Sequence, residues 1–158
     1  MTGSKHTLRR IRVIAINDDE FTYRRTHNRD RDRVFECMTT PADLAHFWGP
    51  VGTHTPLANI VVDLRPGGAF ETTMVNDADG SEYRMRAVYV DVDPPSSLAW
   101  REVESGVLTT LTFIDLGDGT TEVVTHQRGL PEHYRTPEAR AGWQTSLDRF
   151  AHYLEENP

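Results

Sequence analysis

Two side chains, Glu102 and His126, are the candidates for proton transfer in this chain. Glu102 comes two residues after Trp100 in a stretch with strand-like alternation, so a regular strand places both on one apolar face. A carboxyl group there would lose solvent, which raises its pKa and suits it to act as a general acid or base. Alternatively, Glu102 lies at the strand end and reaches water. The inward parity of His126 stays open, and the two would act together only inside the same cavity.

The histidines show no spacing typical of a metal site. They are His6, His27, His46, His54, His126, His133 and His152. None is two or four residues from another, so the fold would have to assemble a zinc site from distant ligands, and we expect no metal. Residues 77–82 are similar to part of a calcium loop but lack two of its ligand positions, which favours a hairpin turn.

Nucleophile and cofactor motifs are also missing. The sequence contains no Gly-x-Ser-x-Gly, no phosphate loop and no dinucleotide fingerprint, so we expect no cofactor. The single cysteine, Cys37, lies among apolar residues of a predicted short helix. We interpret it as a small buried hydrophobe rather than a nucleophile.

Composition excludes several classes of protein. The net charge is −7, and the acidic excess follows residue 35, which leaves no contiguous basic face for nucleic acid. Apolar runs such as residues 87–90 are far shorter than the roughly 20 residues of a membrane helix, so no membrane insertion is expected. The first seven residues lack the apolar core of a signal peptide, which together with the single cysteine predicts a cytoplasmic location.

Three helices are predicted. Asn28 or Asp30 begins a short one, and Thr40 followed by Pro41 begins a second. A long helix follows Thr136, and its apolar residues recur at spacings of three and four: Ala139, Trp143, Leu147, Phe150 and Leu154. Gly142 costs a helix interior about 1 kcal/mol relative to Ala, so we interpret it as a close approach by a backbone or a ligand.

The region between the short helices and the long one predicts an antiparallel meander. Extended segments are expected at residues 58–64, 69–75, 81–92, 98–103, 107–116 and 120–128, with earlier ones at 8–16 and 21–26. Short turns join the later segments, and such connections require antiparallel neighbours. Alternation gives the sheet one aromatic-rich face and one charged face. Only the long helix is large enough to cover the first.

Residues of the apolar face would line a cavity if the sheet and the helix do not close fully. The candidates are Trp48, Phe70, Met74, Tyr83, Met85, Tyr89, Trp100, Phe113, Trp143 and Leu147. Tryptophan, tyrosine and methionine are typical of adaptable apolar pockets that keep a few polar groups. The alternative is that these side chains form an ordinary core.

A series of short motifs carries a resemblance to a known family. They are Phe47–Pro50 (FWGP), Asp63–Phe70 (DLRPGGAF), Asp79–Tyr83 (DGSEY), Val88-Tyr89, Pro94-Pro95, Thr112-Phe113, His126–Pro131 (HQRGLP) and Gly142–Asp148 (GWQTSLD). From about Phe21 to Leu154 the chain resembles the START-like superfamily (SRPBCC, helix-grip fold), in the branch named after the activator of the Hsp90 ATPase. The resemblance implies an α+β fold in which a curved antiparallel sheet of about six to seven strands wraps a long C-terminal helix.

That fold serves lipid carriers, polyketide cyclases and chaperone regulators alike, so the fold by itself does not determine the function. We expect a hydrophobic small-molecule ligand that is lipid-, polyketide- or aromatic-like. One alternative is an enzyme that cyclises, dehydrates or hydrolyses its substrate with Glu102, His126 or a tyrosine hydroxyl. Another is a chaperone-interaction module, as the family name implies. A homodimer is left open. Residues 1–17 are interpreted as an N-terminal extension able to add a strand, and residues 18–158 as a single domain.

Overall fold

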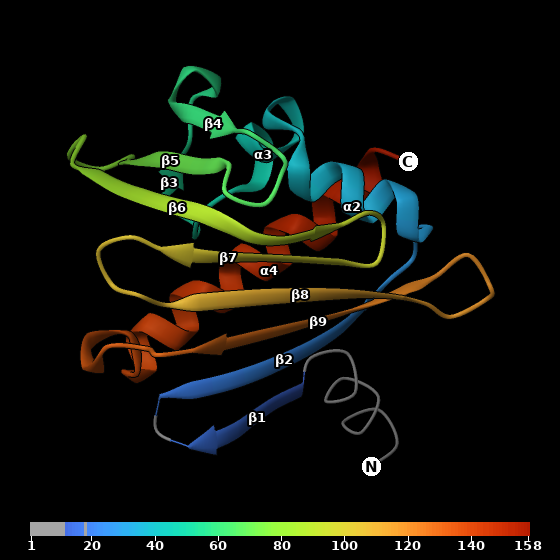
Figure 1. Cartoon of the computed structure of the whole chain (residues 1–158). Coiled ribbons are helices and arrows are strands. Elements are labelled where there is room, and N and C mark those ends of the chain that lie inside the picture. The colour runs from blue at the N-terminus through green and yellow to red at the C-terminus, as the bar shows by residue number, and fades with distance from the viewer. Residues whose placement is uncertain (1–11, 18) are drawn as a thin grey trace, which may run out of the picture.

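One antiparallel sheet is built from nine strands of the described residues (Figure 1). The computed structural model describes residues 12–17 and 19–158. The strands are β1 (Arg12–Asn17), β2 (Glu20–His27), β3 (Thr53–His54), β4 (Ile60–Val62), β5 (Ala69–Asn76), β6 (Glu82–Asp93), β7 (Ser97–Glu102), β8 (Leu108–Asp115) and β9 (Thr121–Arg128). The helices are α2 (Arg31–Thr39), α3 (Pro41–Phe47), α4 (Pro137–Glu156) and the single-turn 3-10 helices η1 (Leu57–Asn59) and η2 (Glu132–Tyr134).

The order of the strands confirms the expected meander. It runs β1-β2-β9-β8-β7-β6-β5-β3, with β4 also paired to β5. The described sheet has more strands than the expected six to seven, because further strands join both of its edges. At one edge β3 and β4 pair with β5, and at the other β1 pairs with β2. Residues 8–11 of the expected first strand lie outside the described residues.

Polar side chains cap two of the three predicted helices at the expected positions. The Asp30 carboxylate accepts a hydrogen bond from the backbone N–H of Arg33 at 2.9 Å, and the Thr136 hydroxyl accepts one from that of Ala139 at 3.1 Å. These bonds satisfy N–H groups that a helix start leaves without a partner. The long helix α4 lies across one face of the sheet, and α2 and α3 flank its C-terminal end (Figure 1).

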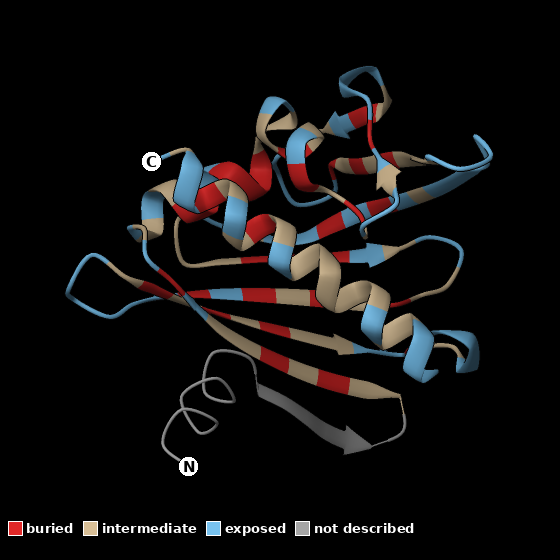
Figure 2. Ribbon diagram, turned by 180° about the vertical axis from the view of Figure 1, so that it is seen from behind, coloured by how far each residue is buried: buried red, intermediate tan, exposed pale blue. Residues whose placement is uncertain are grey.

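The main core lies where α2, α3 and the C-terminal half of α4 meet the sheet. Phe35 of α2 packs edge-on against Phe113 of β8 with ring centroids 5.2 Å apart. The Phe47 ring of α3 lies 4.7 Å from that of Phe150 of α4. Along α4 the buried residues are Phe150 and Leu154, both in its C-terminal half (Figure 2). This end of the helix is therefore sealed against the sheet.

The N-terminal half of α4 is packed less closely. It meets a second, smaller core cluster that contains Phe21, Tyr23, Val107 and Leu130. Trp143 and Leu147 of α4 pack against this cluster but are only partly buried. The helix thus lies over the sheet along its whole length but is sealed at one end.

No backbone or side chain approaches Gly142, so the interpretation of this glycine as a close approach by a backbone is wrong, and an approach by a ligand stays a prediction. A Cβ atom built on Gly142 would meet no atom within 4 Å. The glycine therefore lowers the helix propensity of α4 without making room for a neighbour. Gly68 is different, because a Cβ atom there would lie 2.0 Å from the backbone oxygen of Asp63.

We predict that Gly142→Ala raises the free energy of unfolding by about 0.5–1 kcal/mol, because alanine restricts the unfolded chain and fits the helix. The matched variant Gly68→Ala should lower it by about 1–3 kcal/mol, since the new methyl group forces the chain apart. Urea unfolding of both variants measures the difference. A destabilised Gly142→Ala would contradict the open packing at this turn of α4.

Candidate functional site

A cavity of about 350 Å³ lies between the sheet and α4, along the part of the helix from Ala139 to Phe150. Its volume falls at the lower end of the range of small-molecule sites, roughly 300–1,000 Å³. Seven of the ten predicted residues line it: Trp48, Met74, Tyr83, Met85, Trp100, Trp143 and Leu147. The structure thus brings together aromatic and thioether side chains from α4, the sheet and the C-terminal end of α3.

The other three predicted residues, Phe70, Tyr89 and Phe113, do not line the cavity. They point to the same face of the sheet but lie in the main core. Phe70 and Tyr89 stack with ring centroids 5.4 Å apart, and Phe113 packs against Phe35 of α2. The alternation of the strands predicts the face correctly. The position of a residue along its strand decides whether it faces the closely packed C-terminal half of α4 or the less closely packed N-terminal half.

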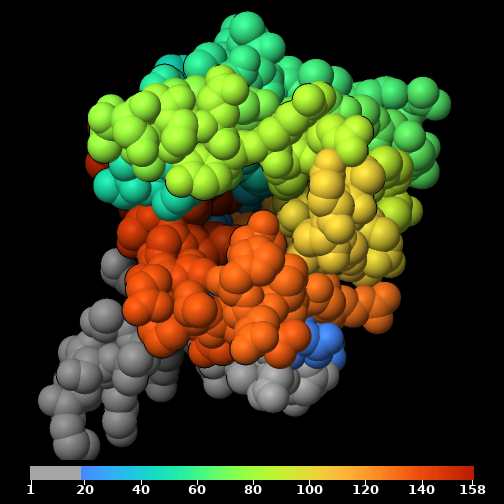
Figure 3. Space-filling model, turned by 90° about the vertical axis from the view of Figure 1, so that its left-hand side faces the viewer, coloured from blue at the N-terminus to red at the C-terminus, as the bar shows by residue number. Residues whose placement is uncertain are grey.

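The mouth of the cavity opens at the N-terminal end of α4. In Figure 3 the surface is hollowed between the β5–β6 hairpin in yellow-green, the β7–β8 turn in yellow, and η2 with the start of α4 in orange. Tyr83 lines the cavity from the hairpin and is 52% exposed. Tyr134 of η2 and Arg140 of α4 line it from the opposite side. A ligand could therefore enter without crossing the main core.

Arg149 of α4 holds the loop that forms one rim of this cavity. Its guanidinium donates hydrogen bonds to the backbone oxygens of Gly49 at 2.8 Å and Pro50 at 3.2 Å. A third bond reaches the oxygen of Thr53 at 3.3 Å. Burial lowers the pKa of Arg149 from its ordinary value. These bonds tie the segment between α3 and β3 to α4, and both Gly49 and Pro50 line the cavity.

Glu102 lies at the end of β7 and lines the cavity. Its Oε1 atom accepts a hydrogen bond from the Ser105 hydroxyl at 2.9 Å. Burial raises the pKa of Glu102, and the nearby Glu104 raises it further, while the Ser105 hydrogen bond acts in the opposite direction. Burial also raises the pKa of Tyr134, with a further contribution from the charge of Glu102. A half-buried carboxyl group beside a phenol can exchange protons with a ligand.

His126 points away from the cavity, so the condition for acting together with Glu102 is not met. Its Nε2 atom lies 2.9 Å from Oε1 of Glu20, on the outer face of the sheet. The flanking residues Thr125 and Gln127 line the cavity instead. Alternation along β9 therefore settles the parity that the sequence left open.

Sequence reasoning missed the inward side chains of β2. Phe21, Tyr23, Arg25 and His27 all line the cavity, and their spacing of two is the signal that would have found them. His27 is 6% exposed, and burial, with a smaller contribution from the charge of Arg25, lowers its pKa to about 4. Its imidazole is therefore neutral at neutral pH.

Arg140 was missed as well. It precedes Trp143 by three residues and Leu147 by seven, which places it on the face of α4 that lines the cavity. A search of the apolar stripe alone passes over such a residue, because arginine is not counted among apolar positions.

Metal binding, thiol chemistry at Cys37 and membrane-spanning helices find no support in the described part of the chain. No group of three or more His, Cys, Asp or Glu side chains there could hold a metal ion. Cys37 is buried, and burial raises its pKa to about 12, which keeps the thiol protonated. None of the described helices has both the length and the apolar character that a membrane span requires.

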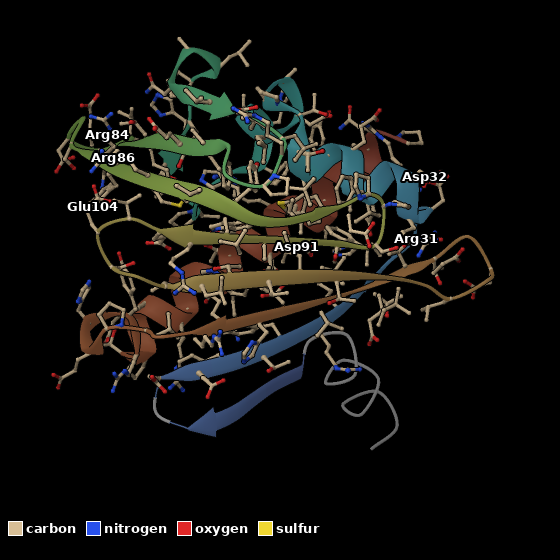
Figure 4. All side chains as sticks on the ribbon, viewed as in Figure 1. Arg31, Asp32, Arg84, Arg86, Asp91 and Glu104 are labelled. Carbon is tan, nitrogen blue, oxygen red and sulfur yellow. The ribbon has the colours of Figure 1, made fainter. Side chains whose placement is uncertain are left out.

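We predict that Glu102 titrates above the ordinary value of a glutamate, because its charged form is desolvated. Glu104 should titrate below that value, since the hydrogen bond from Arg86 favours its charged form. Figure 4 shows Glu104, Arg84 and Arg86 together beside the N-terminal end of β6. Removing the Ser105 hydroxyl by Ser105→Ala should raise the pKa of Glu102 further. Carbon-detected NMR titration of the carboxyl groups measures all three, and a Glu102 that titrates with or below Glu104 would contradict its burial.

Known structures share this fold. A crystal structure of a protein from Chromobacterium violaceum has a TM-score of 0.77 at 23% identity, covering 87% of this chain and 98% of its own. One from Rhodobacter sphaeroides has a TM-score of 0.81 at 16% identity, covering 94% and 99%. The solution structure of the AHSA1-like protein from Aeromonas hydrophila has a TM-score of 0.71 at 23% identity, covering 85% and 92%. At these identities the likeness shows the fold alone.

No curated protein is significantly similar to the chain in sequence. The family described as "Activator of Hsp90 ATPase homolog 1-like protein" matches residues 28–155, which run from the end of β2 to the last turn of α4. This span contains α4 and all the lining strands except β2, so the cavity is largely built from the matched region. The chain therefore belongs to the family of activator of Hsp90 ATPase homolog 1-like proteins, with the START-like helix-grip fold that the sequence motifs indicated.

Proposed function

We propose that this protein binds a hydrophobic small molecule in the cavity between the sheet and α4. The observation that carries the proposal is the cavity itself, a space of about 350 Å³ with a predominantly apolar lining and an open mouth. Binding there removes apolar surface of the ligand from water, at roughly 25 cal/mol per Å² before the costs of association. A lipid-like, polyketide-like or aromatic molecule fits this lining.

The side chains of the lining suit ligands of varied shape. Met38, Met74 and Met85 contribute flexible thioether side chains, which adapt to different contacts. Trp48, Trp100 and Trp143 contribute large rigid surfaces. Trp48 already uses its indole N–H, which donates to the Thr72 hydroxyl at 3.1 Å, so its ring presents mainly apolar surface.

An enzyme is the second candidate function, and the half-buried carboxyl group of Glu102 favours it. Without His126, Glu102 would act as acid or base alone or with the Tyr134 hydroxyl, in a cyclisation, dehydration or hydrolysis. Glu102→Gln should then lower turnover by about 10²–10⁴-fold and leave ligand affinity nearly unchanged. Equal turnover in both proteins would remove Glu102 from any catalytic role.

Other expectations from the sequence stay predictions. A chaperone-interaction module rests on the family alone. The cytoplasmic location, the homodimer and the division of the chain at residue 17 rest on the sequence alone. The absence of a nucleic-acid partner rests on the acidic net charge of −7.

We predict saturable binding of the neutral apolar dye Nile red, with a blue-shifted emission because the dye leaves water for an apolar site. Ser146→Phe should weaken binding about ten-fold or more, because Ser146 lines the cavity and a phenyl ring would occupy ligand space. Fluorescence titration gives both affinities.

Ala141→Phe is the matched control, since Ala141 lies on the same helix but is exposed. It should bind the dye as the unmodified protein does. No saturable binding by the unmodified protein, or equal losses in the two variants, would count against a ligand site in this cavity.

A further inference from the structure

Four charged side chains line the cavity, and they differ in whether an oppositely charged side chain pairs with them. Arg25 forms an ion pair with Asp148 of α4 at 2.7 Å, and Arg84 forms one with Glu71 at 3.7 Å. Glu102 is the one acid in the described lining, and the Ser105 hydroxyl holds it. Arg140 pairs with no carboxylate among residues 19–158. The cavity therefore contains one cation whose charge no acidic side chain balances.

The surroundings of Arg140 hold its guanidinium at the cavity wall. Its central carbon lies 4.0 Å from the centroid of the Phe21 ring, a cation–π contact that orients the flat group. The Nε atom is buried and has no hydrogen-bond partner among the described residues. A buried donor without a partner is costly, and a carboxylate is the partner that a guanidinium binds best.

Tyr23 lies beside this cation and is a second donor. The side chain is 4% exposed and lines the cavity, and its ring lies 4.2 Å from that of Trp143. Its hydroxyl makes no hydrogen bond to any residue of 19–158. Burial raises the pKa of Tyr23 and the charge of Arg140 lowers it, so the phenol is protonated and within the field of the guanidinium. A hydroxyl donor and an unbalanced cation on one wall form a site for an anion.

We propose that the ligand is an amphipathic anion, with a carboxylate bound by Arg140 and Tyr23 and an apolar chain that runs along α4 toward Phe150. This inference rests on the proposed function and names the chemical class of its ligand. From Arg140 to Phe150 the helix rises about 15 Å, at roughly 1.5 Å per residue. Both residues line the cavity, so it extends along this stretch of the helix.

Polarity along the cavity favours one orientation of such a ligand. The mouth lies at the N-terminal end of α4, where a bound carboxylate keeps part of its hydration, so its desolvation costs less free energy. The inner end meets Phe47, Phe150 and the neutral imidazole of His27, which suits an apolar tail. Glu102 opposes an anion only when ionised, and its desolvation disfavours the ionised form.

Displacement of Nile red by sodium decanoate and by 1-decanol tests the inference, because the two chains share length and differ in charge. In Arg140→Gln the affinity for decanoate should fall about ten-fold relative to that for decanol, as expected when a charge-assisted hydrogen bond is lost. Tyr23→Phe keeps the ring and should lower the affinity for decanoate about five-fold while leaving the affinity for decanol unchanged. Arg65→Gln removes the same charge from a side chain that is 70% exposed and should change neither affinity.

Each outcome separates the inference from the proposed function. A selective loss of decanoate in the Arg140 and Tyr23 variants supports both. If decanoate and decanol bind but keep their affinity ratio in both variants, the anion site is wrong and the apolar site stands. Tighter binding of decylamine than of decanoate would also overturn the anion site, since Glu102 would then set the preference. If neither decanoate nor decanol displaces the bound dye, the inference is wrong, and the proposed function is then decided by the Nile red titrations of the unmodified protein and Ser146→Phe.

Discussion

Phe150 anchors the C-terminal half of α4, and the cavity depends on that anchor. Its ring lies 4.7 Å from Phe47 of α3 and 5.2 Å edge-on from His27 of β2. The short helices α2 and α3 complete the seal at this end only (Figure 1). A straight helix fixed at one end over a twisted sheet leaves a gap at the other end unless large side chains fill it. Here Trp143 and Leu147 fill it only in part.

Polar contacts near the middle of α4 hold the helix in place without closing the space beneath its N-terminal half. Arg149 ties the rim loop to the helix through backbone oxygens, and Arg25 reaches across from β2 to Asp148. Inside the cavity, Gln127 donates to the Thr109 hydroxyl at 3.2 Å, so these two polar groups satisfy each other. In the proposed function the apolar lining would account for binding in general, whereas Arg140, Tyr23 and Glu102 would determine which ligands bind and in which orientation.

Much of the fold could be predicted from local signals, because alternation and helix caps act over a few residues. The parity of Trp100 and Met85 followed from alternation within their own strands. The same rule could not separate Met85 from Tyr89, because only the placement of α2 and α3 decides which of them is sealed. His126 was ambiguous because both faces of β9 carry β-branched or polar residues. The sequence could not show whether a neighbour approaches Gly142, because a glycine within a helical pattern is the same in a sequence in either case.

Intermolecular NOEs from a bound ligand to methyl-labelled methionine test the central claim most directly. Met38, Met74 and Met85 line the cavity from α2, β5 and β6, so their methyl groups report on three of its walls. With 1-decanol bound at saturation, we predict NOEs from the alkyl chain to all three methyl groups. A decanol complex without NOEs to any of them would place the ligand elsewhere and contradict a binding site between the sheet and α4.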